Sequence, residues 1–181
     1  MSGLNDLLGK DAEKKIQAWL DRPDLGYCFD RIPDQMTGLY GSKNICDFAC
    51  FKSPYFFYIE SKATWEDTFK FSMLYNNTKV ADYRTGDTQF KKLLEKSQIQ
   101  NVFSIVIVCF ASYKRSFIFD IRELDKLIQQ GTKSLNINKL SKWDFPYVEI
   151  PTIPSRKTLL DYSGDLIQLT KIFGETYEEM H

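Results

Sequence analysis

The chain has 181 residues, enough for one domain with a sizeable core, and its 43% hydrophobic and 15% aromatic content argues against a disordered protein. Its 24 basic and 24 acidic residues cancel, which argues against a surface coated in basic charge but leaves room for a local basic groove. No apolar run approaches the roughly 20 residues of a membrane span, and the first residues lack the pattern of a signal peptide. We therefore expect a single cytoplasmic domain over residues 1–181.

The first third of the chain predicts a helix followed by three strands. Residues 4–20 carry apolar side chains at helical spacing, and a proline-containing turn ends the segment. Residues 26–33 have strand character, and the polar segment 34–43 connects them to two further strand-like runs, 44–51 and 55–63. A tight turn, Lys52-Ser53-Pro54, separates these two runs and predicts a hairpin.

In the middle of the chain, some segments predict secondary structure clearly and others do not. Residues 64–85 are rich in both aromatic and polar side chains, and we expect irregular or partly helical structure there. Residues 88–98 predict a helix. Residues 101–110 are almost continuously apolar and β-branched, which is typical of a strand buried on both faces.

The last third predicts a partner strand at 116–121, a helix at 122–130 that ends at Gly131, a strand at 147–150 and a final helix at 157–173. The order helix, strands, helix, strands, helix indicates a mixed α/β domain with one sheet flanked by helices.

The four cysteines form no C-x-x-C pair, and the only histidine is the terminal His181, so a structural zinc site is not expected. The cysteines are predicted to be buried, reduced thiols. Hydrolysis by a serine or cysteine nucleophile is not expected, because the sequence has no internal histidine to act as the base. ATP use is not indicated either, because the sequence has no phosphate-binding G-x-x-x-x-G-K-[ST] loop.

Three charged residues of the hairpin stand out as candidates for chemistry. Glu60 and Lys62 share one face of their strand because side chains alternate, and Asp47 is the one acid of the preceding strand-like run and is expected in the middle of that strand. The hairpin can bring Asp47 close to Glu60. An acid in an apolar strand is costly unless it is paired or bound to a metal. Two carboxylates and water suit Mg²⁺ or Mn²⁺, and a lysine beside them can stabilise charge on a phosphate.

A plainer alternative is a salt bridge from Lys62 to Asp47 or Glu60 on a solvated sheet face. An acid-x-lysine pattern is weak by itself, since Glu13-Lys14-Lys15 on the first helix matches it too. The hairpin context favours the metal site over the salt bridge.

With these residues identified, the stretch NICDFACFKSPYFFYIESKAT resembles the core of the PD-(D/E)XK nuclease superfamily, and more closely that of RecU-type Holliday junction resolvases. The likeness continues in the helix around Glu13, in the helix start at Gln89, and in the strands and helix that follow. It implies a restriction-endonuclease-like mixed β-sheet flanked by α-helices. It also implies a homodimeric, Mg²⁺-dependent endonuclease that acts on four-way DNA junctions.

The resemblance also implies roles for individual residues. Asp47 and Glu60 would bind Mg²⁺ (or Mn²⁺) with Glu13 as an outer acidic contributor, Lys62 would be the catalytic lysine, and Gln89 would support the site or contact the phosphate. Two of these assignments have ordinary alternatives. Glu13 lies on a charge-rich helix and can be a solvated side chain, and Gln89 can simply cap its helix.

Departures from the family bear on the substrate. The long stalk insertion of RecU enzymes is replaced by residues 34–43, and Ala63 stands where the family has an acid. These differences leave the cleavage core in place and put junction selectivity in question, and such a short version is typical of bacteriophage or mobile-element proteins. The alternatives are a nuclease of this superfamily that cuts duplex, flapped or single-stranded DNA, and a non-catalytic DNA-binding protein on the same fold.

Overall fold

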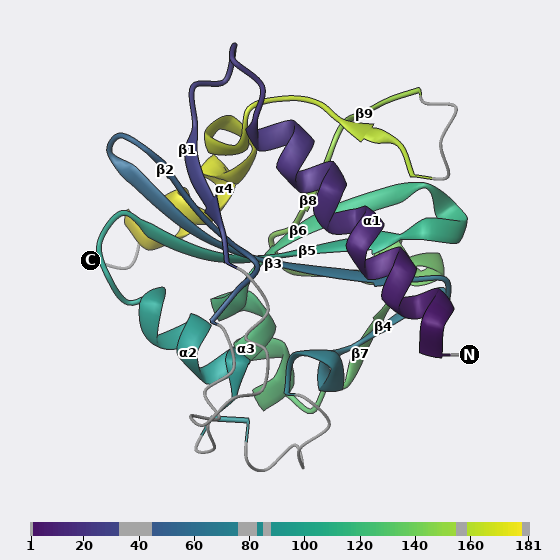
Figure 1. Ribbon diagram of the computed structural model, residues 1–181. Coiled ribbons are helices and arrows are strands. Elements are labelled where there is room, and N and C mark those ends of the chain that lie inside the picture. Colours follow the sequence, from purple (N-terminus) through teal and green to yellow (C-terminus); the bar gives the residue numbers. More distant parts are fainter. Residues whose placement is uncertain (1, 33–44, 76–82, 85–87, 155–158, 179–181) are drawn as a thin grey trace, which may run out of the picture.

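In a computed structural model of the chain, the described residues exclude 1, 33–44, 76–82, 85–87, 155–158 and 179–181. The central element is a six-stranded sheet in the order β1-β2-β3-β5-β6-β8 (Figure 1). Strands β3 and β5 are parallel, and the other neighbours are antiparallel. The strands are β1 (Cys28–Arg31), β2 (Phe48–Lys52), β3 (Tyr55–Thr64), β5 (Val102–Phe110), β6 (Arg115–Asp120) and β8 (Val148–Glu149).

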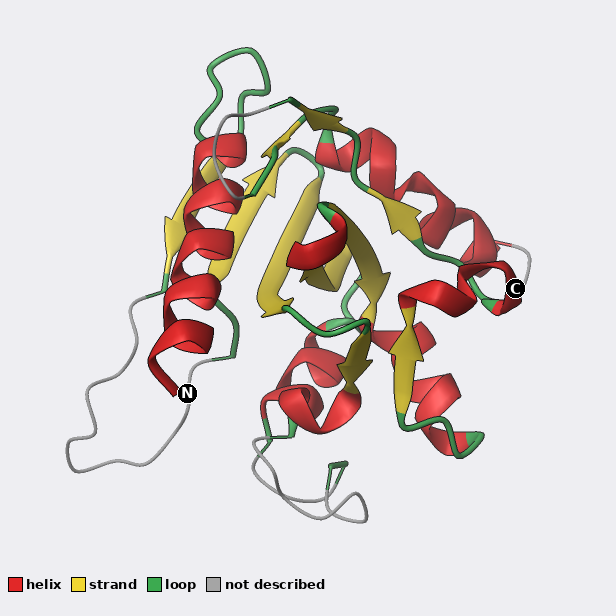
Figure 2. Cartoon of the chain, turned by 90° about the vertical axis from the view of Figure 1, so that its right-hand side faces the viewer, coloured by secondary structure: helices red, strands yellow, loops and turns green. Residues whose placement is uncertain are grey.

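Helices cover both faces of this sheet (Figures 1 and 2). Helices α1 (Ser2–Leu20) and α4 (Leu166–Glu178) pack on one face, and α2 (Gln89–Lys96) and α3 (Ile121–Gln129) pack on the other. The mixed α/β architecture predicted from the sequence, one mixed sheet flanked by helices, is thereby confirmed. None of the described helices combines the length and apolar character needed to span a membrane.

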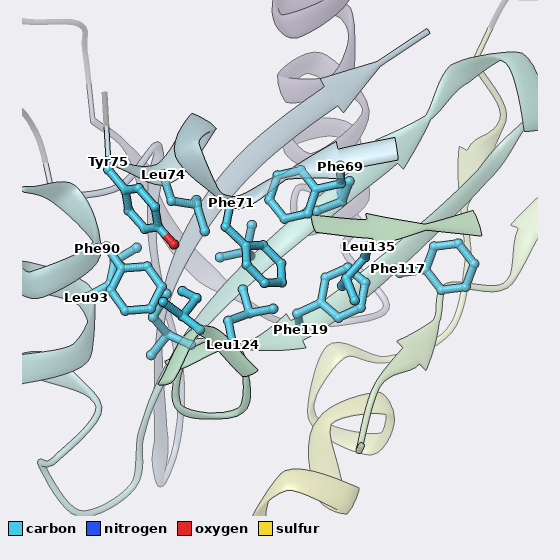
Figure 3. Close-up of a cluster of buried hydrophobic side chains, with 14 of the residues drawn as sticks. Phe69, Phe71, Leu74, Tyr75, Phe90, Leu93, Phe117, Phe119, Leu124 and Leu135 are labelled. Atoms are coloured by element: carbon cyan, nitrogen blue, oxygen red, sulfur yellow. The ribbon is translucent and has the colours of Figure 1, made fainter. Parts of the chain in front are cut away.

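Strand β5 shows why the sheet is central to the core. Ile105 and Ile107 contribute to the cluster under α1 and α4, while Val106 and Val108 contribute to the cluster under α2 and α3. The second cluster is rich in aromatic rings, among them Phe117 and Phe119 of β6 (Figure 3). The prediction that residues 101–110 form a strand buried on both faces is therefore confirmed, because alternate side chains supply two separate cores.

Smaller elements complete the fold. Strands β4 (Thr68–Lys70) and β7 (Ser134–Asn136) pair with each other, as do β9 (Thr152–Ile153) and β10 (Asp161–Tyr162). Short 3-10 helices span Phe71–Leu74, Ala111–Tyr113 and Ile137–Lys142.

Several sequence predictions need correction. The final helix begins at Leu166 rather than near residue 157, because Asp161 and Tyr162 form β10 against β9. Residues 68–70, expected to be irregular or helical, form β4. The connector 34–43 lies outside the described residues. All four cysteines are free thiols, but Cys28 is exposed, so the expectation of burial was wrong for that residue.

Candidate active site

Asp47 lies where the β2–β3 hairpin opens, one residue before β2 rather than in the middle of the strand. The backbone ladder still passes through it, since its N–H donates to the carbonyl of Ile59 at 3.0 Å and its carbonyl accepts from the N–H of Ile32 at 2.8 Å. Its carboxylate Oδ2 accepts from the backbone N–H of Ser61 at 2.7 Å. The side chain is therefore held against β3, directly beside the strand segment that carries Glu60.

Glu60 is buried in the middle of β3 with two side-chain partners. Only 2% of its surface is exposed, although it is an acid. Its Oε2 accepts from Nε2 of Gln89 at 2.6 Å, and its Oε1 accepts from the ammonium of Lys62. These contacts fix the orientation of the carboxylate, and they bring Gln89, from the first turn of α2, into the same site as the two hairpin residues.

The surroundings of Glu60 favour its protonated form. Burial raises the pKa of Glu60 to about 8, and the neighbouring Asp47 carboxylate adds to this, while the ammonium of Lys62 acts in the opposite direction. A carboxyl group kept away from water beside a second carboxylate retains its proton until a cation takes that place. The two neighbouring carboxyl groups of Asp47 and Glu60 can therefore both ionise only when a further positive charge lies between them.

Lys62 stays charged in this setting. Burial lowers the pKa of Lys62, but the carboxylates of Glu60, Asp47 and Glu13 outweigh it and raise the pKa above its ordinary value. Its side chain is 19% exposed. At neutral pH it is an ammonium that can donate hydrogen bonds to a solvent-borne ligand, and it is not a base that accepts a proton.

Glu13 lies on α1 at the margin of this group. Its carboxylate is ion-paired with the guanidinium of Arg31 on β1, and its charge also acts on Lys62. Arg31 did not figure among the residues predicted from the sequence. The one signal was a basic residue in the predicted strand at 26–33, but nothing local in the sequence indicates that β1 faces the middle of α1.

Gln89 does not cap its helix. Thr88 does so, since its Oγ1 accepts from the N–H of Lys91 at 3.1 Å. The hydroxyl of Thr88 also donates to the carbonyl of Tyr83 at 2.6 Å, which leaves the side chain of Gln89 available for Glu60. The structure thus brings together Asp47, Glu60, Lys62 and Gln89, with Glu13 linked through electrostatics.

The salt bridge considered as the plainer alternative is present between Lys62 and Glu60, but its environment differs from that expectation. Glu60 is buried and Lys62 is half-buried, so the contact does not lie on a fully solvated face. Withdrawing an ammonium and a carboxyl group from water costs free energy, so stability alone does not explain this contact.

The donor set suits a hard divalent cation. Within the described part of the chain, no group of three or more histidine, cysteine, aspartate or glutamate side chains is placed to hold a metal. Two carboxylates are nevertheless what Mg²⁺ commonly takes from a protein, with water and substrate phosphate completing its octahedral shell. The buried, protonated Glu60 beside Asp47 fits this chemistry, because a cation would replace both the retained proton and the contact with Lys62.

Comparisons with known proteins give a limited likeness. No family model matches the chain, and no curated protein matches its sequence. Among solved structures, Hjc from Archaeoglobus fulgidus, described as a Holliday junction resolvase, shares 13% identity with a TM-score of 0.43. The match covers 64% of this chain and 78% of that one.

Proposed function

We propose that this protein is a divalent-metal-dependent endonuclease that hydrolyses phosphodiester bonds in DNA, with branched DNA as its substrate. One observation supports this above all others: a buried carboxyl group, Glu60, is held beside Asp47 within hydrogen-bonding reach of a charged lysine and an amide. The family resemblance of the hairpin sequence points to the same activity and supplies the choice of branched DNA.

Two carboxylates would hold the cation, and the lysine would stabilise negative charge on the phosphate. Asp47 and Glu60 would hold Mg²⁺ or Mn²⁺, which lowers the pKa of a bound water and neutralises charge on the scissile phosphate. Lys62, displaced from Glu60 by the cation, would donate hydrogen bonds to the attacking water or to a phosphate oxygen. Gln89 would keep Glu60 oriented, or turn its amide toward the phosphate.

The first test separates metal binding from chemistry. Lys62→Met should lower the rate of Mg²⁺-dependent nicking of a synthetic four-way junction by roughly 100-fold or more, since removal of one charge-stabilising donor costs about that much. Titration calorimetry with Mn²⁺ should show that Lys62→Met still binds the ion, whereas Asp47→Asn does not. Lys171→Met, at an exposed position on α4, is the matched control and should behave like the wild type.

The number of protons released on Mn²⁺ binding is a second readout of this test. Because Glu60 retains a proton at neutral pH, Mn²⁺ binding should release protons, seen as a binding enthalpy that changes with the ionisation enthalpy of the buffer. Full nicking activity in Asp47→Asn, or wild-type protein that binds no Mn²⁺, would contradict the proposal and leave a non-catalytic DNA-binding protein.

A second candidate keeps the chemistry and changes the DNA. Residues 34–43 occupy the place in the sequence where RecU-type enzymes carry their stalk. Duplex, flapped or single-stranded DNA is therefore the alternative substrate. A panel of equally labelled junction, duplex, flap and single-stranded DNA distinguishes the two, because preference for linear duplex over the junction would favour the alternative.

A further inference from the structure

An exposed tryptophan lies close to the candidate active site. Trp65 directly follows β3, three residues beyond Lys62, and 41% of its surface is exposed. The other two tryptophans are packed: Trp19 is 1% exposed, and Trp143 lies against the rings of β6. Since a large aromatic side chain loses favourable burial when it faces water, the exposure of Trp65 calls for an explanation.

The backbone that carries Trp65 is well anchored. Its carbonyl accepts from Oγ of Ser112 at 2.7 Å, and the next residue, Glu66, donates its N–H to Oγ1 of Thr64 at 3.0 Å. Ser112 in turn precedes Tyr113, a second exposed aromatic residue, whose hydroxyl accepts from Nδ2 of Asn138 at 3.0 Å. Two exposed rings are thus held on linked segments at one end of the sheet.

Both rings present part of their surface to solvent. Among the described residues, no other aromatic ring stacks on Trp65 or Tyr113. Two exposed lysines accompany them in the chain, Lys114 after Tyr113 and Lys139 after Asn138, and neither has an ion-pair partner in the described part of the structure. Proteins that bind single-stranded nucleic acid combine exposed aromatic rings, on which bases stack, with cations that meet the phosphates, and these two segments carry both kinds of side chain.

We propose that Trp65, assisted by Tyr113, is a stacking platform for an unpaired DNA base beside the scissile phosphate, an inference that rests on the proposed nuclease function. In a continuous duplex the base faces are covered by neighbouring bases, so Trp65 selects DNA with unpaired nucleotides, such as a flap or a frayed branch point. Three residues of strand span roughly 10 Å. Trp65 therefore lies next to the end of β3 that carries Lys62, within reach of DNA bound at the candidate site.

The binding test is run without metal, so that it does not depend on cleavage. Tryptophan emission is followed while a flap DNA, and separately a continuous duplex of the same sequence, is added in the presence of EDTA. The flap should quench the wild type and leave Trp65→Phe unquenched, because the packed tryptophans do not reach the DNA. Trp65→Leu should bind the flap roughly 5- to 100-fold more weakly, the usual effect of losing one stacked base, and its affinity for duplex should not change.

Phe51→Leu is the matched control. Phe51 is also an exposed aromatic residue, but it lies beside the hairpin turn at the opposite end of β3, where it pairs with Phe56. Its replacement should leave flap binding and quenching unchanged. Circular dichroism of each variant verifies that the fold is retained.

The outcomes separate this inference from the proposed function. If the wild type cleaves DNA and Trp65→Leu matches it in flap affinity and in KM for the flap, the stacking platform is overturned while the nuclease stands. Equal quenching by flap and duplex would also overturn it. If the wild type cleaves no DNA in Mg²⁺ or Mn²⁺, the proposed nuclease fails, and flap-selective quenching that is lost in Trp65→Phe would still support the platform.

Discussion

The buried carboxyl group of Glu60 lowers the free energy of unfolding when the pH is high enough to ionise it. In the unfolded chain its carboxyl ionises near the ordinary value of 4.5, whereas burial raises the folded pKa to about 8. Between these values the folded state binds a proton that the unfolded state has released, so stability falls as the pH rises through this window. The site is thus least stable under the conditions in which its carboxylates are ready for a cation.

Glu60→Gln should remove this pH dependence, because an amide of similar shape does not ionise. In EDTA, the urea midpoint of the wild type should fall between pH 5 and pH 8 by the equivalent of a few kcal/mol, and that of Glu60→Gln should stay nearly level. The exposed Glu95→Gln is the control and should follow the wild type. Parallel wild-type and Glu60→Gln profiles would mean that Glu60 is not protonated in the folded chain.

The sequence predicted how the candidate residues are arranged along their strands, but it did not predict their long-range contacts. The alternation of β3 correctly placed Glu60 and Lys62 on one face, because side-chain direction in a strand is a local property. The contact of Gln89 with Glu60 depends on how α2 packs across β5, and the pairing of Glu13 with Arg31 depends on how α1 crosses β1. Local patterns do not encode these long-range relations, and Trp65 went unnoticed because its exposure shows only in three dimensions.

At the scale of elements, the start of α2 controls where Gln89 points. Thr88 is buried, caps the helix through its hydroxyl and holds the carbonyl of Tyr83 with the same group. Gln89 is the first residue of the helix, so the cap sets the direction in which its side chain leaves the backbone.

Thr88→Ala should therefore affect both stability and activity. Loss of the cap should cost about 1 kcal/mol or somewhat more in urea unfolding. It should also lower kcat for nicking several-fold, because Gln89 no longer holds Glu60 in one orientation. Thr88→Ser keeps the hydroxyl and should restore both. Reduced stability with an unchanged kcat would show that Gln89 is positioned independently of the cap.

The elements that the sequence failed to predict share a physical cause. Strands β4, β7, β9 and β10 have two or three residues each, too few for an alternating pattern to emerge. Their formation depends on a partner far along the chain: Phe69 pairs with Leu135, and Tyr162 with Thr152. The long strand β5 was predictable because its apolar, β-branched run is visible without any partner.

At the scale of the whole molecule, the described part of each chain offers one pair of carboxylates proposed to hold the metal, Asp47 and Glu60. Cutting a four-way junction into two duplexes requires two nicks on opposing strands. Two-fold symmetry in the DNA is most simply matched by two copies of the chain related by a two-fold axis. The homodimer expected from the family resemblance follows from this requirement and stays a prediction.

Mixing experiments test the dimer through its products. A supercoiled plasmid that extrudes a cruciform becomes linear when both strands are cut within the lifetime of one complex, and becomes a nicked circle when one is cut. The wild type should yield mainly linear DNA, and light scattering should give twice the chain mass. An excess of Asp47→Asn, exchanged into mixed dimers, should divert the product to nicked circles, since each mixed dimer retains one working site. A monomeric mass on junction DNA, with linear product unaffected by the added variant, would show that single chains cut independently.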